Sequence, residues 1–495
     1  MAGMCGGIGL SAARAYTYNG IQAPQVEPNP LADQLEQKLS TLRAQLRSRA
    51  VEATLEAAIE QALLRNPELA QAFTQIQQRE WSLIAVRRQW YPRIDANSVG
   101  PSNGLWGYRG SSTNQSNTVD NLETTQTINL AQDQLAVQLG LSWTFFDPTR
   151  APQINAASED VRSQELLFNV TARNLVLQTQ LSYFSLKEQQ RLIEAYDKIL
   201  VATSDQVRQV ESLFNVGNAS IADVEQIRTQ QYQTLGLLIK AYLGLIEASS
   251  ALAEAMALPQ GQLVLPADGM ETYGSWDLSL DSSIAQAQAL REELQSSLAN
   301  ANASRWRASA LFKRYWPRLT IAASGSYLDS NSRTSVDGSP VRSVENSTRW
   351  DASIGVGFNW SIFDGGIAAA EGESQKALSR QYNDQAAKQR LQITREVEQS
   401  YASYETSRLA LLSSREQAKS AQQAAIAIRQ RFNVGYDTIT AVVQALNQAI
   451  SAANAYSASQ GEYNNAVARL YRSTASWPAD TLSVRDLSIE LLRSR

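Results

Sequence analysis

The stretch ESLFNVGNASIADVEQ, residues 211–226, has a near copy in RQRFNVGYDTITAVVQ, residues 429–444. Both copies place Phe-Asn-Val-Gly inside long Ala/Gln-rich sequence that otherwise avoids glycine. Glycine readily adopts the left-handed backbone conformation with which many helices end. The repeated stretch therefore predicts two helical hairpins in one chain, each reversing at the same four residues.

The duplication extends beyond the two turns. QWYPRIDA (89–96) resembles RYWPRLTI (314–321), and LSWTFFDPTR (141–150) resembles FNWSIFDGGI (358–367). The offset between copies is 225 positions for the first pair of motifs, 217 for the second and 218 for the turn glycines. The halves therefore stay in register except for 8 extra residues in the first half, which we expect to form a loop insertion.

Each half is expected to contain two long antiparallel helices. Residues 153–216 contain no glycine or proline, and apolar residues recur there at three- and four-residue steps. At about 1.5 Å per residue this helix would be ~95 Å long. A run of this length is typical of coiled-coil-like packing. Its Ala-rich apolar stripe predicts close helix contacts. The Gln, Ser and Asn residues at the other positions indicate that one face of the helix is exposed to water.

Between these landmarks the apolar period becomes that of a strand. Apolar and polar residues alternate over 135–145 and 350–362, and more weakly over 319–327 and 93–100. The apolar faces, about 10 to 13 residues long, suit a tilted membrane strand of ~9–11 residues better than a soluble strand of ~5–6. Aromatic residues gather at the strand ends, as in membrane-interface belts. The candidate interface aromatics are Trp90, Tyr91, Trp143, Tyr315, Trp316 and Trp360.

Four strands are too few to close a barrel, and lipid does not tolerate an open sheet edge. We therefore expect a dimer with 8 strands or a trimer with 12. The strand-to-helix junctions are expected at Asp147-Pro148, with Asp147 as N-cap and Pro148 in the first helical position, and at Asp364-Gly365. The alternative is a soluble coiled-coil scaffold with packed β-hairpins, which accounts for the helices but not for long strands with aromatic ends.

Composition excludes other classes of function. The 44 basic and 48 acidic residues give no electrostatic basis for binding nucleic acid. The absence of histidine removes His-based catalysis and most zinc sites, so we expect neither an enzyme nor a cofactor. The N-terminus gives no convincing signal peptide, because no basic region precedes its short apolar part. Cys5, the only cysteine, could mark a lipidation site, or this segment is a misassigned N-terminus.

The duplication predicts the domain organisation. The five segments are 1–50 (N-terminal segment and linker), 51–258 (first repeat), 259–283 (connection), 284–477 (second repeat) and 478–495 (C-terminal segment). In the first repeat a helix precedes a β-hairpin at about 92–147 and long helices at about 148–216 and 218–258. In the second repeat a helix precedes a hairpin at about 317–364 and long helices at about 366–434 and 436–477.

In this order, and twice over, the motifs resemble the TolC family of outer-membrane efflux and secretion channels. The resemblance rests on LEAAIEQALLRNPELAQA (55–72), YPRI and WPRL, WTFFDP and WSIFDGG, and the FNVG turns, and covers roughly residues 50–478. It implies a mainly α chain with a membrane β-barrel portion, in which a homotrimer forms a twelve-stranded barrel on a tunnel of twelve helices. An equatorial region of shorter elements would lie at 31–50, 259–283 and after Pro478.

The resemblance also implies function and location. The chain would be a passive duct in the outer membrane lipid of a Gram-negative-type envelope, with its helical part in the periplasm. It would dock onto an inner-membrane transporter through a periplasmic adaptor, in a tripartite efflux pump or a type I secretion system, and export small molecules or proteins. The turns would form the periplasmic tips and contact the adaptor, although turn geometry alone also requires the glycines. The tip residues are Phe214, Asn215, Val216, Gly217, Phe432, Asn433, Val434 and Gly435.

The family's gate is less well preserved. The resemblance places an Asp six residues past the first turn glycine, where Asp223 stands. It places a Tyr and an Arg around the second turn, where this chain has Phe432 and Asp437, and two acidic residues after it, where this chain has Ala441 and Gln444. Asp223 would thus face Asp437, and three copies would crowd carboxylates around the opening, attracting cations or favouring opening by repulsion. Alternatively, both carboxylates point into water.

Overall fold

The computed structural model describes residues 30–119, 122–269, 271–339 and 343–478. The chain divides into two compact units, and each unit combines three separate stretches of sequence. Unit 1 comprises residues 1–59, 178–276 and 402–468, and unit 2 comprises 60–177, 277–401 and 469–495. The predictions for Cys5 and for the segment after Pro478 lie outside the described residues.

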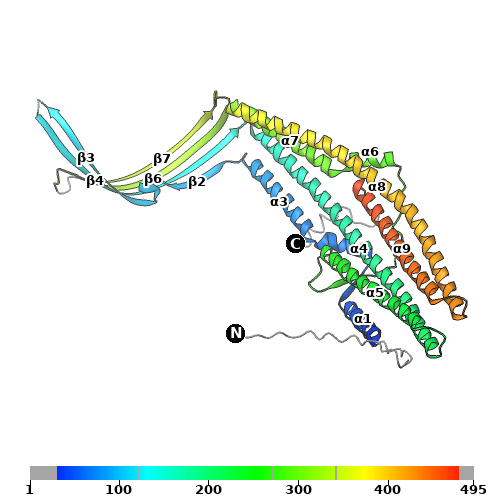
Figure 1. Cartoon of the computed structure of the whole chain (residues 1–495). Helices are drawn as coiled ribbons and strands as arrows, with labels where there is room; N and C mark the ends of the chain where they lie inside the picture. The colour runs from blue at the N-terminus through cyan, green and yellow to red at the C-terminus, as the bar shows by residue number, and fades with distance from the viewer. Residues whose placement is uncertain (1–29, 120–121, 270, 340–342, 479–495) are drawn as a thin grey trace, which may run out of the picture. The chain divides into compact units, whose positions relative to one another are not determined.

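Unit 2 contains a five-stranded antiparallel sheet, whose strands run side by side in Figure 1. Its order is β2-β4-β6-β7, and β3 also pairs with β4. Both predicted hairpins are present, as β3–β4 and β6–β7, and β4 pairs with β6 to join them. The strands are β2 (Arg93–Ser98), β3 (Trp106–Val119), β4 (Leu122–Phe146), β6 (Arg318–Val336) and β7 (Ser343–Asn359).

Strands β2 and β3 are two parts of one long strand that is interrupted by a bulge. Ser98 pairs with Val137 and Trp106 pairs with Leu135, so residues 99–105 stand opposite Ala136 alone. This segment, which we call the strand bulge, contains the short 3-10 helix η1 (Pro101–Asn103). It accounts for most of the expected insertion, which therefore lies within a strand. Strand β3 was not predicted, because its mostly polar residues do not alternate with apolar ones.

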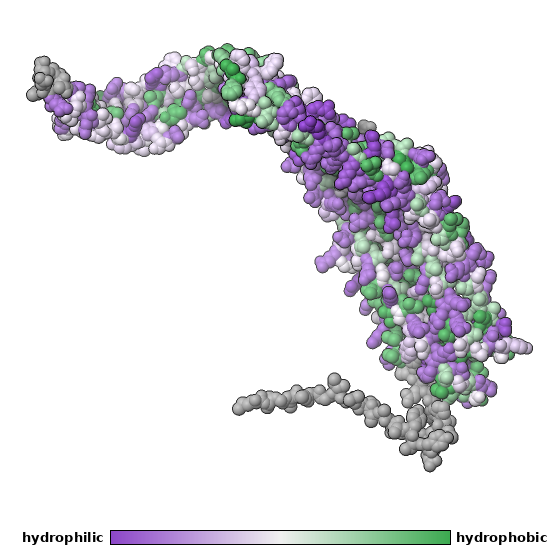
Figure 2. All heavy atoms as spheres, turned by 45° about the horizontal axis from the view of Figure 1, so that its top comes forward, coloured by the Kyte–Doolittle hydropathy of each residue, from purple (hydrophilic) through white to green (hydrophobic). Residues whose placement is uncertain are grey.

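The strand register gathers apolar residues on one face of the sheet. In one row Ile94 pairs with Leu141, Leu141 with Ala323, and Ala323 with Ile354. The other members of this apolar face are Ala96, Val137, Leu139, Trp143, Ile321, Gly325, Tyr327, Trp350, Ala352, Val356 and Phe358. The alternation predicted along β4 and β7 is thereby confirmed. Figure 2 shows hydrophobic residues concentrated where the strands lead into the helices.

The opposite, polar face carries hydroxyl, amide and charged side chains. Its rows include Asp95 paired with Gly140, Gly140 with Ser324, and Ser324 with Ser353. Strand β7 ends at Asn359, earlier than the alternation to residue 362 suggested. The reason is that β6 begins at Arg318, directly after Pro317, so β7 has no ladder partner beyond Asn359.

Each hairpin is preceded by two helices where we predicted one. Helices α2 (Leu55–Arg65) and α3 (Pro67–Arg88) precede the first hairpin. Helices α6 (Leu280–Leu290) and α7 (Glu292–Phe312), followed by the 3-10 turn η2 (Lys313–Tyr315), precede the second. The first break occurs because Pro67 has no N–H and the Asn66 side chain caps the new helix through the Glu68 N–H at 2.8 Å. The second break lies at Arg291, whose backbone is extended.

The four long helices are α4 (Arg150–Asn215), α5 (Ile221–Ala255), α8 (Ile367–Asn433) and α9 (Ile439–Ser473). Helix α4 begins two residues later than predicted. The Asp147 carboxylate accepts hydrogen bonds from Thr149 N (2.9 Å) and Thr149 Oγ1 (2.7 Å), which holds a turn in front of the helix. Thr149, rather than Asp147, therefore precedes the first helical residue. Pro148 lies in this turn and not in the helix.

Helix α5 is long and apolar enough to cross a membrane by length and composition alone. Its most apolar 18 residues are 44% buried within the protein, however, and its buried side chains include Gln230, Gln231 and Thr234. A packed helix of a folded protein has these properties as well, so α5 is weak evidence for a spanning helix.

Unit 1 joins two segments that we expected to be equatorial. Helix α1 (Pro30–Arg49) leads into β1 (Ala50–Ala53), which pairs in parallel with β5 (Leu263–Pro266). Ser249 on α5 anchors β5, because its hydroxyl accepts a hydrogen bond from Val264 N at 2.7 Å and donates one to Val264 O at 2.8 Å. The segments 31–50 and 259–283 therefore meet in one small sheet.

Helices α5 and α9 end earlier than predicted because each is followed by an alanine in the left-handed conformation. Ala257 has φ of 51° and Ala475 has φ of 54°. Leu258 N donates to Ala253 O at 2.9 Å, and Ser476 N donates to Tyr471 O at 2.9 Å. These bonds close the helix ends in the Schellman pattern, at a position where glycine is the usual residue.

We predict that Ala257→Gly stabilises the protein by up to ~1 kcal/mol, because it relieves the left-handed alanine. For a chain of this size the melting temperature in detergent would rise by about 1–2 °C. Ala251→Gly, at an exposed position inside α5, is the control and should lower the melting temperature. An equal decrease of the melting temperature in both variants would contradict the prediction.

Candidate functional site

The two FNVG turns share one backbone geometry. Gly217 and Gly435 both have φ of 81°. Asn218 N donates to Leu213 O at 2.8 Å, and Tyr436 N donates to Arg431 O at 2.9 Å. Each turn therefore closes its helix by the Schellman pattern, which requires the left-handed residue that glycine supplies.

The ends of the hairpins share a hydrophobic core in unit 1. Its buried residues are Val207, Val210, Val224, Ile227, Ile439 and Val442. Phe214 and Phe432, one from each turn motif, are partly buried against this core. Phe432, a predicted gate residue, thus has a packing role. The other predicted residues of the second hairpin, Ala441 and Gln444, lie in the first turns of α9 and are half-buried and exposed, respectively.

The tip turns expose apolar side chains. Val216 is 67% exposed, Val434 is 69% exposed and Tyr436 is 79% exposed. We call these three residues the tip surface. Asn215 and Asn433 are also exposed beside them. Each turn motif therefore packs one side chain, Phe214 or Phe432, against the core. The residues of the tip surface remain exposed in the single chain.

Asp223 completes a capping box at the start of α5. Its carboxylate accepts hydrogen bonds from Ser220 N (2.8 Å) and Ser220 Oγ (2.7 Å), while Asp223 N donates to Ser220 Oγ at 3.2 Å. The duplicate position in α9 is Ala441, whose N–H donates to Thr438 Oγ1 at 3.4 Å. The first hairpin therefore has the stronger N-terminal cap.

Asp437 also bonds within its own turn. Its Oδ2 lies 2.9 Å from Arg431 Nε, across the second turn. The structure thus gives each predicted gate carboxylate a local partner, Ser220 for Asp223 and Arg431 for Asp437. The hairpin tips are joined to one another by neutral contact, with Thr440 Oγ1 donating to Gln226 Oε1 at 3.3 Å.

The predicted interface aromatics form matching contacts in the two repeats. Trp143 Nε1 donates to Trp90 O at 2.8 Å, and Trp360 Nε1 donates to Tyr315 O at 2.8 Å. Each bond ties the end of a hairpin to the end of the helical segment that precedes it. Tyr91 and Trp316, the neighbouring aromatics, are 72% and 60% exposed.

The second junction is capped by Asp364. Its carboxylate accepts hydrogen bonds from Gly366 N (3.0 Å), Ala368 N (2.9 Å) and Tyr315 Oη (2.7 Å). Gly365 has φ of 71°, so the glycine allows the sharp turn in which the carboxylate meets the first N–H groups of α8. Asp147 and Asp364 therefore hold equivalent turns through one shared bond, to the N–H of the second residue after each, and Asp364 also accepts the N–H of Ala368 in α8.

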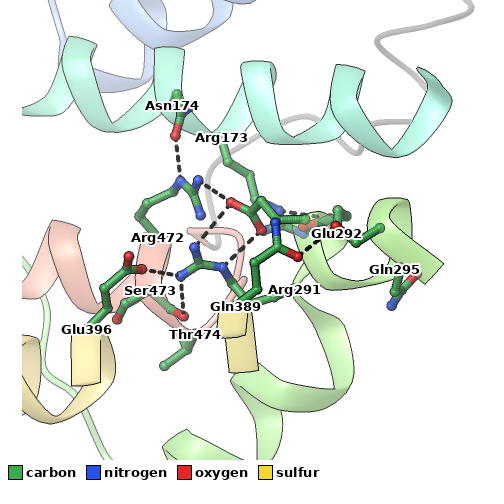
Figure 3. Close-up of polar contacts among 12 residues, drawn as sticks. Arg173, Asn174, Arg291, Glu292, Gln295, Gln389, Glu396, Arg472, Ser473 and Thr474 are labelled. Carbon is green, nitrogen blue, oxygen red and sulfur yellow. Dashed lines mark hydrogen bonds and ion pairs between the residues drawn. The ribbon is translucent and has the colours of Figure 1, made fainter. Parts of the chain in front are cut away.

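A cluster of charged residues in unit 2 was missed by the sequence analysis. Figure 3 shows Arg173 and Asn174 on α4, Arg472 and Ser473 on α9 and Glu396 on α8 around Arg291. We call Arg173, Arg291, Glu292, Glu293, Glu396 and Arg472 the ion cluster. Its residues come from distant parts of the sequence and carry no recognisable spacing.

Arg291 and Glu293 are central to the ion cluster. Arg291 donates to both oxygens of Glu293, from Nε at 3.0 Å and from Nη2 at 3.1 Å, and its Nη1 donates to Glu396 Oε2 at 2.9 Å. Arg472 Nη2 donates to Glu293 Oε1 at 2.6 Å. Although burial opposes ionisation of Glu293, the Arg472 and Arg291 guanidiniums lower its pKa to about 2.

We predict that Glu293→Gln lowers stability near neutral pH by about 3 kcal/mol, since it leaves two buried guanidiniums without their shared carboxylate. The carboxylate's contribution is fully present above about pH 4.5 and is lost as pH falls through about 2, because the folded pKa is depressed. Thermal unfolding measured from pH 7 to pH 2 should therefore be less acid-sensitive in the variant. Glu405→Gln, which removes an exposed pair with Arg408, is the control. An unchanged pH profile in Glu293→Gln would contradict the assignment.

Among the described residues, no group of three or more His, Cys, Asp or Glu side chains could hold a metal ion. The arrangement of turns, sheet and ion cluster provides docking and packing surfaces.

Comparison with known proteins agrees with this architecture. The outer membrane efflux protein BepC of Brucella suis biovar 1 (strain 1330) is 22% identical over 341 residues, which are 67% of this chain and 68% of BepC. The CmeC outer membrane channel of Campylobacter jejuni has a TM-score of 0.67 at 15% identity, over 89% of this chain and 90% of that one. The MtrE outer membrane channel of Neisseria gonorrhoeae, solved in its open state, has a TM-score of 0.63 at 15% identity. The match covers 85% of this chain and 89% of MtrE.

The family model for outer membrane efflux proteins matches residues 58–258 and 283–476, which are the two repeats. The predicted resemblance to TolC-type channels is thereby confirmed, and with it an outer-membrane transport duct in place of an enzyme. The chain belongs to the outer membrane efflux protein family.

Proposed function

We propose that three copies of the chain close a twelve-stranded barrel in the outer membrane and continue as a tunnel of helices into the periplasm. The observation that carries this proposal is the apolar face of the sheet, which runs in register over four strands. As described, the sheet ends in β2 and β3 on one side and in β7 on the other. Backbone groups on such edges need partners in lipid, and further copies supply them.

The apolar face has dimensions that suit an outer membrane. On β7 it runs from Trp350 to Phe358, roughly 26 Å of extended strand, which a ~40° tilt reduces to about 20 Å. Tyr327 and Trp350 stand at one margin. Toward the other margin lie Trp143, in register with Val356, and Trp360, which follows the last residue of β7. Membrane barrels carry an apolar band of ~25 Å between two aromatic girdles.

The soluble-scaffold alternative leaves this face unexplained. Ile354 is 80% exposed, Val356 is 73% exposed and Phe358 is 74% exposed. The opposite face bears hydroxyl pairs, such as Thr144 with Thr320 at 3.1 Å and Ser324 with Ser353 at 2.9 Å, which suit a water-filled lumen. In a membrane barrel the apolar face meets lipid and the polar face meets the water of the lumen, so both faces are accounted for. In a soluble scaffold both faces would meet water, which suits only the polar face.

The duct is passive and works with two partners in this proposal. An inner-membrane transporter supplies the energy, and a periplasmic adaptor joins it to the tip surface in a tripartite pump or a type I secretion system. The exposed Val216, Val434 and Tyr436 support adaptor contact, because exposed apolar groups at a rigid turn are suited to burial by a partner. The exported solutes are small molecules or proteins.

We predict a heat-sensitive trimer that leaves the membrane only with detergent. Val356→Arg, on the apolar face, should reduce the trimer in the outer-membrane fraction several-fold, because a charge in the lipid band costs ~2–4 kcal/mol. Gly355→Arg, one residue away on the polar face and with open space around it, is the matched control and should be tolerated. The assay is gel migration of membrane extracts with and without heating. A soluble monomer, or equal tolerance of both variants, would contradict the proposal.

Gating at the tips is a separate part of the proposal. Asp223 and Asp437 are the acidic side chains beside the turns, and each already has a local partner. Asp437→Arg should lower single-channel conductance in planar bilayers, because the new guanidinium offers Asp223 an opposite charge across the opening. Asp437→Asn, which removes the charge without adding a partner, separates this effect from loss of the Arg431 pair. Unchanged conductance and ion selectivity in Asp437→Arg would count against a gate at these residues.

A further inference from the structure

The strand bulge, residues 99–105, lies over the polar face of the sheet. Ala136, the single residue opposite it, belongs to the polar face and is 0% exposed. Gly107 pairs with Gln134 on the same face, and a Cβ on Gly107 would stand 3.0 Å from both Cβ and O of Pro101. Two independent positions therefore place Pro101 and its neighbours on the side of the sheet that carries polar residues.

The strand bulge is held in one conformation by its own hydrogen bonds. Gly100 N donates to Gly104 O at 3.0 Å, and Asn103 N donates to Gly100 O at 3.0 Å. Ser98 Oγ donates to Asn103 O at 2.5 Å. A Cβ on Gly100 would lie 2.6 Å from Gly104 O, so this close crossing of the backbone requires glycine. The bulge is a folded protrusion with defined geometry.

The exposed tip of the strand bulge is polar and uncharged. Ser102 and Asn103 are exposed and adopt the left-handed conformation, with φ of 55° and 58°. Such conformations are strained for residues other than glycine and persist where the surrounding structure imposes them. On the same face, Arg109 is the next residue along β3 after Gly107 and pairs in register with Gln132, while Arg349 and Asp351 on β7 pair with each other at 2.8 Å.

The strand bulge stands at the outer margin of the apolar face. Ser98, the residue before it, is in register with Val137, Tyr327 and Trp350. The next strand, β3, continues along β4 beyond the apolar face. The protrusion is therefore near the level of the aromatic margin that lies away from the helices.

We infer that the strand bulges of the assembled copies project into the lumen of the barrel and form a second constriction, at the level of the outer margin of the apolar face and distinct from the helix tips. The inference rests on the proposed barrel, in which the polar face lines the lumen. The ring presents Ser102 hydroxyls and Asn103 amides, with Arg109 next to it on the polar face. It consequently restricts solutes by size.

Cysteine labelling tests this placement. In a Cys5→Ser background the chain has no other thiol. Ser102→Cys should react with a water-soluble thiol reagent in reconstituted channels, and coupling to a 5-kDa polyethylene glycol maleimide should lower single-channel conductance at least two-fold. Ala352→Cys, on the apolar face, is the control; it should react with a lipid-soluble reagent, and its labelling should leave conductance unchanged. Asn103→Cys repeats the test if Ser102→Cys assembles poorly.

The outcomes separate this inference from the proposed function. If the unlabelled protein forms channels but polymer on Ser102→Cys and Asn103→Cys leaves conductance unchanged, the constriction is refuted while the duct stands. Reaction of both cysteines with the lipid-soluble reagent alone would place the bulge outside the barrel and refute the inference too. If the protein forms no channel with or without label, the proposed function as a duct is refuted.

Discussion

The register of β4 is the constraint on which the sheet depends. This strand pairs with β2, β3 and β6, so its alternation sets which side chains share a face over most of the sheet. A slip of one residue would turn Leu139 and Leu141 to the polar face and Gln138 and Ser142 to the apolar one. The bulge between β2 and β3 keeps both segments in phase with β4 although seven residues lie opposite one. The apolar face, and the membrane function that it supports, follow from this register.

The two repeats share their hairpin contacts and turn geometry but differ in some of the side chains that stabilise them. Both hairpins are tied back by a tryptophan indole that donates to a backbone carbonyl oxygen, through Trp143 and Trp360. The carboxylates that hold the junction turns both accept the N–H two residues on, from Thr149 and Gly366. Their other bonds differ, since Asp147 accepts the Thr149 hydroxyl and Asp364 accepts the Ala368 N–H of α8. The turn geometry is shared, while the caps after the turns diverge. The copies therefore preserve backbone geometry more faithfully than the side chains that support it.

The ion cluster shows how unit 2 is held where helices meet at a break. Arg291 lies between α6 and α7, at the position that Asn66 and Pro67 occupy in the first repeat. The first repeat makes its break with a local side-chain cap, and the second uses a guanidinium that bonds to Glu293, Glu396 and the carbonyl oxygen of Ser473. Charged groups that are this buried require each other, because removing one leaves the rest without compensation.

Sequence alone determined the duplication, the FNVG hairpins, the alternating strands and the family, because each is carried by short motifs or periodic patterns that are complete within a few neighbouring residues. The break at Asn66-Pro67 and the capping box of Ser220 and Asp223 carry local signals that the sequence could have provided. The left-handed Ala257 and Ala475 carry none, because alanine rarely adopts that conformation. The strand bulge, the apolar rows across the sheet and the ion cluster were decided only by the tertiary structure. Their members are as far apart as Arg173 and Glu292, or Ile94 and Ile354. No local pattern records which distant residues will be paired, because pairing is set by register and packing of the folded chain.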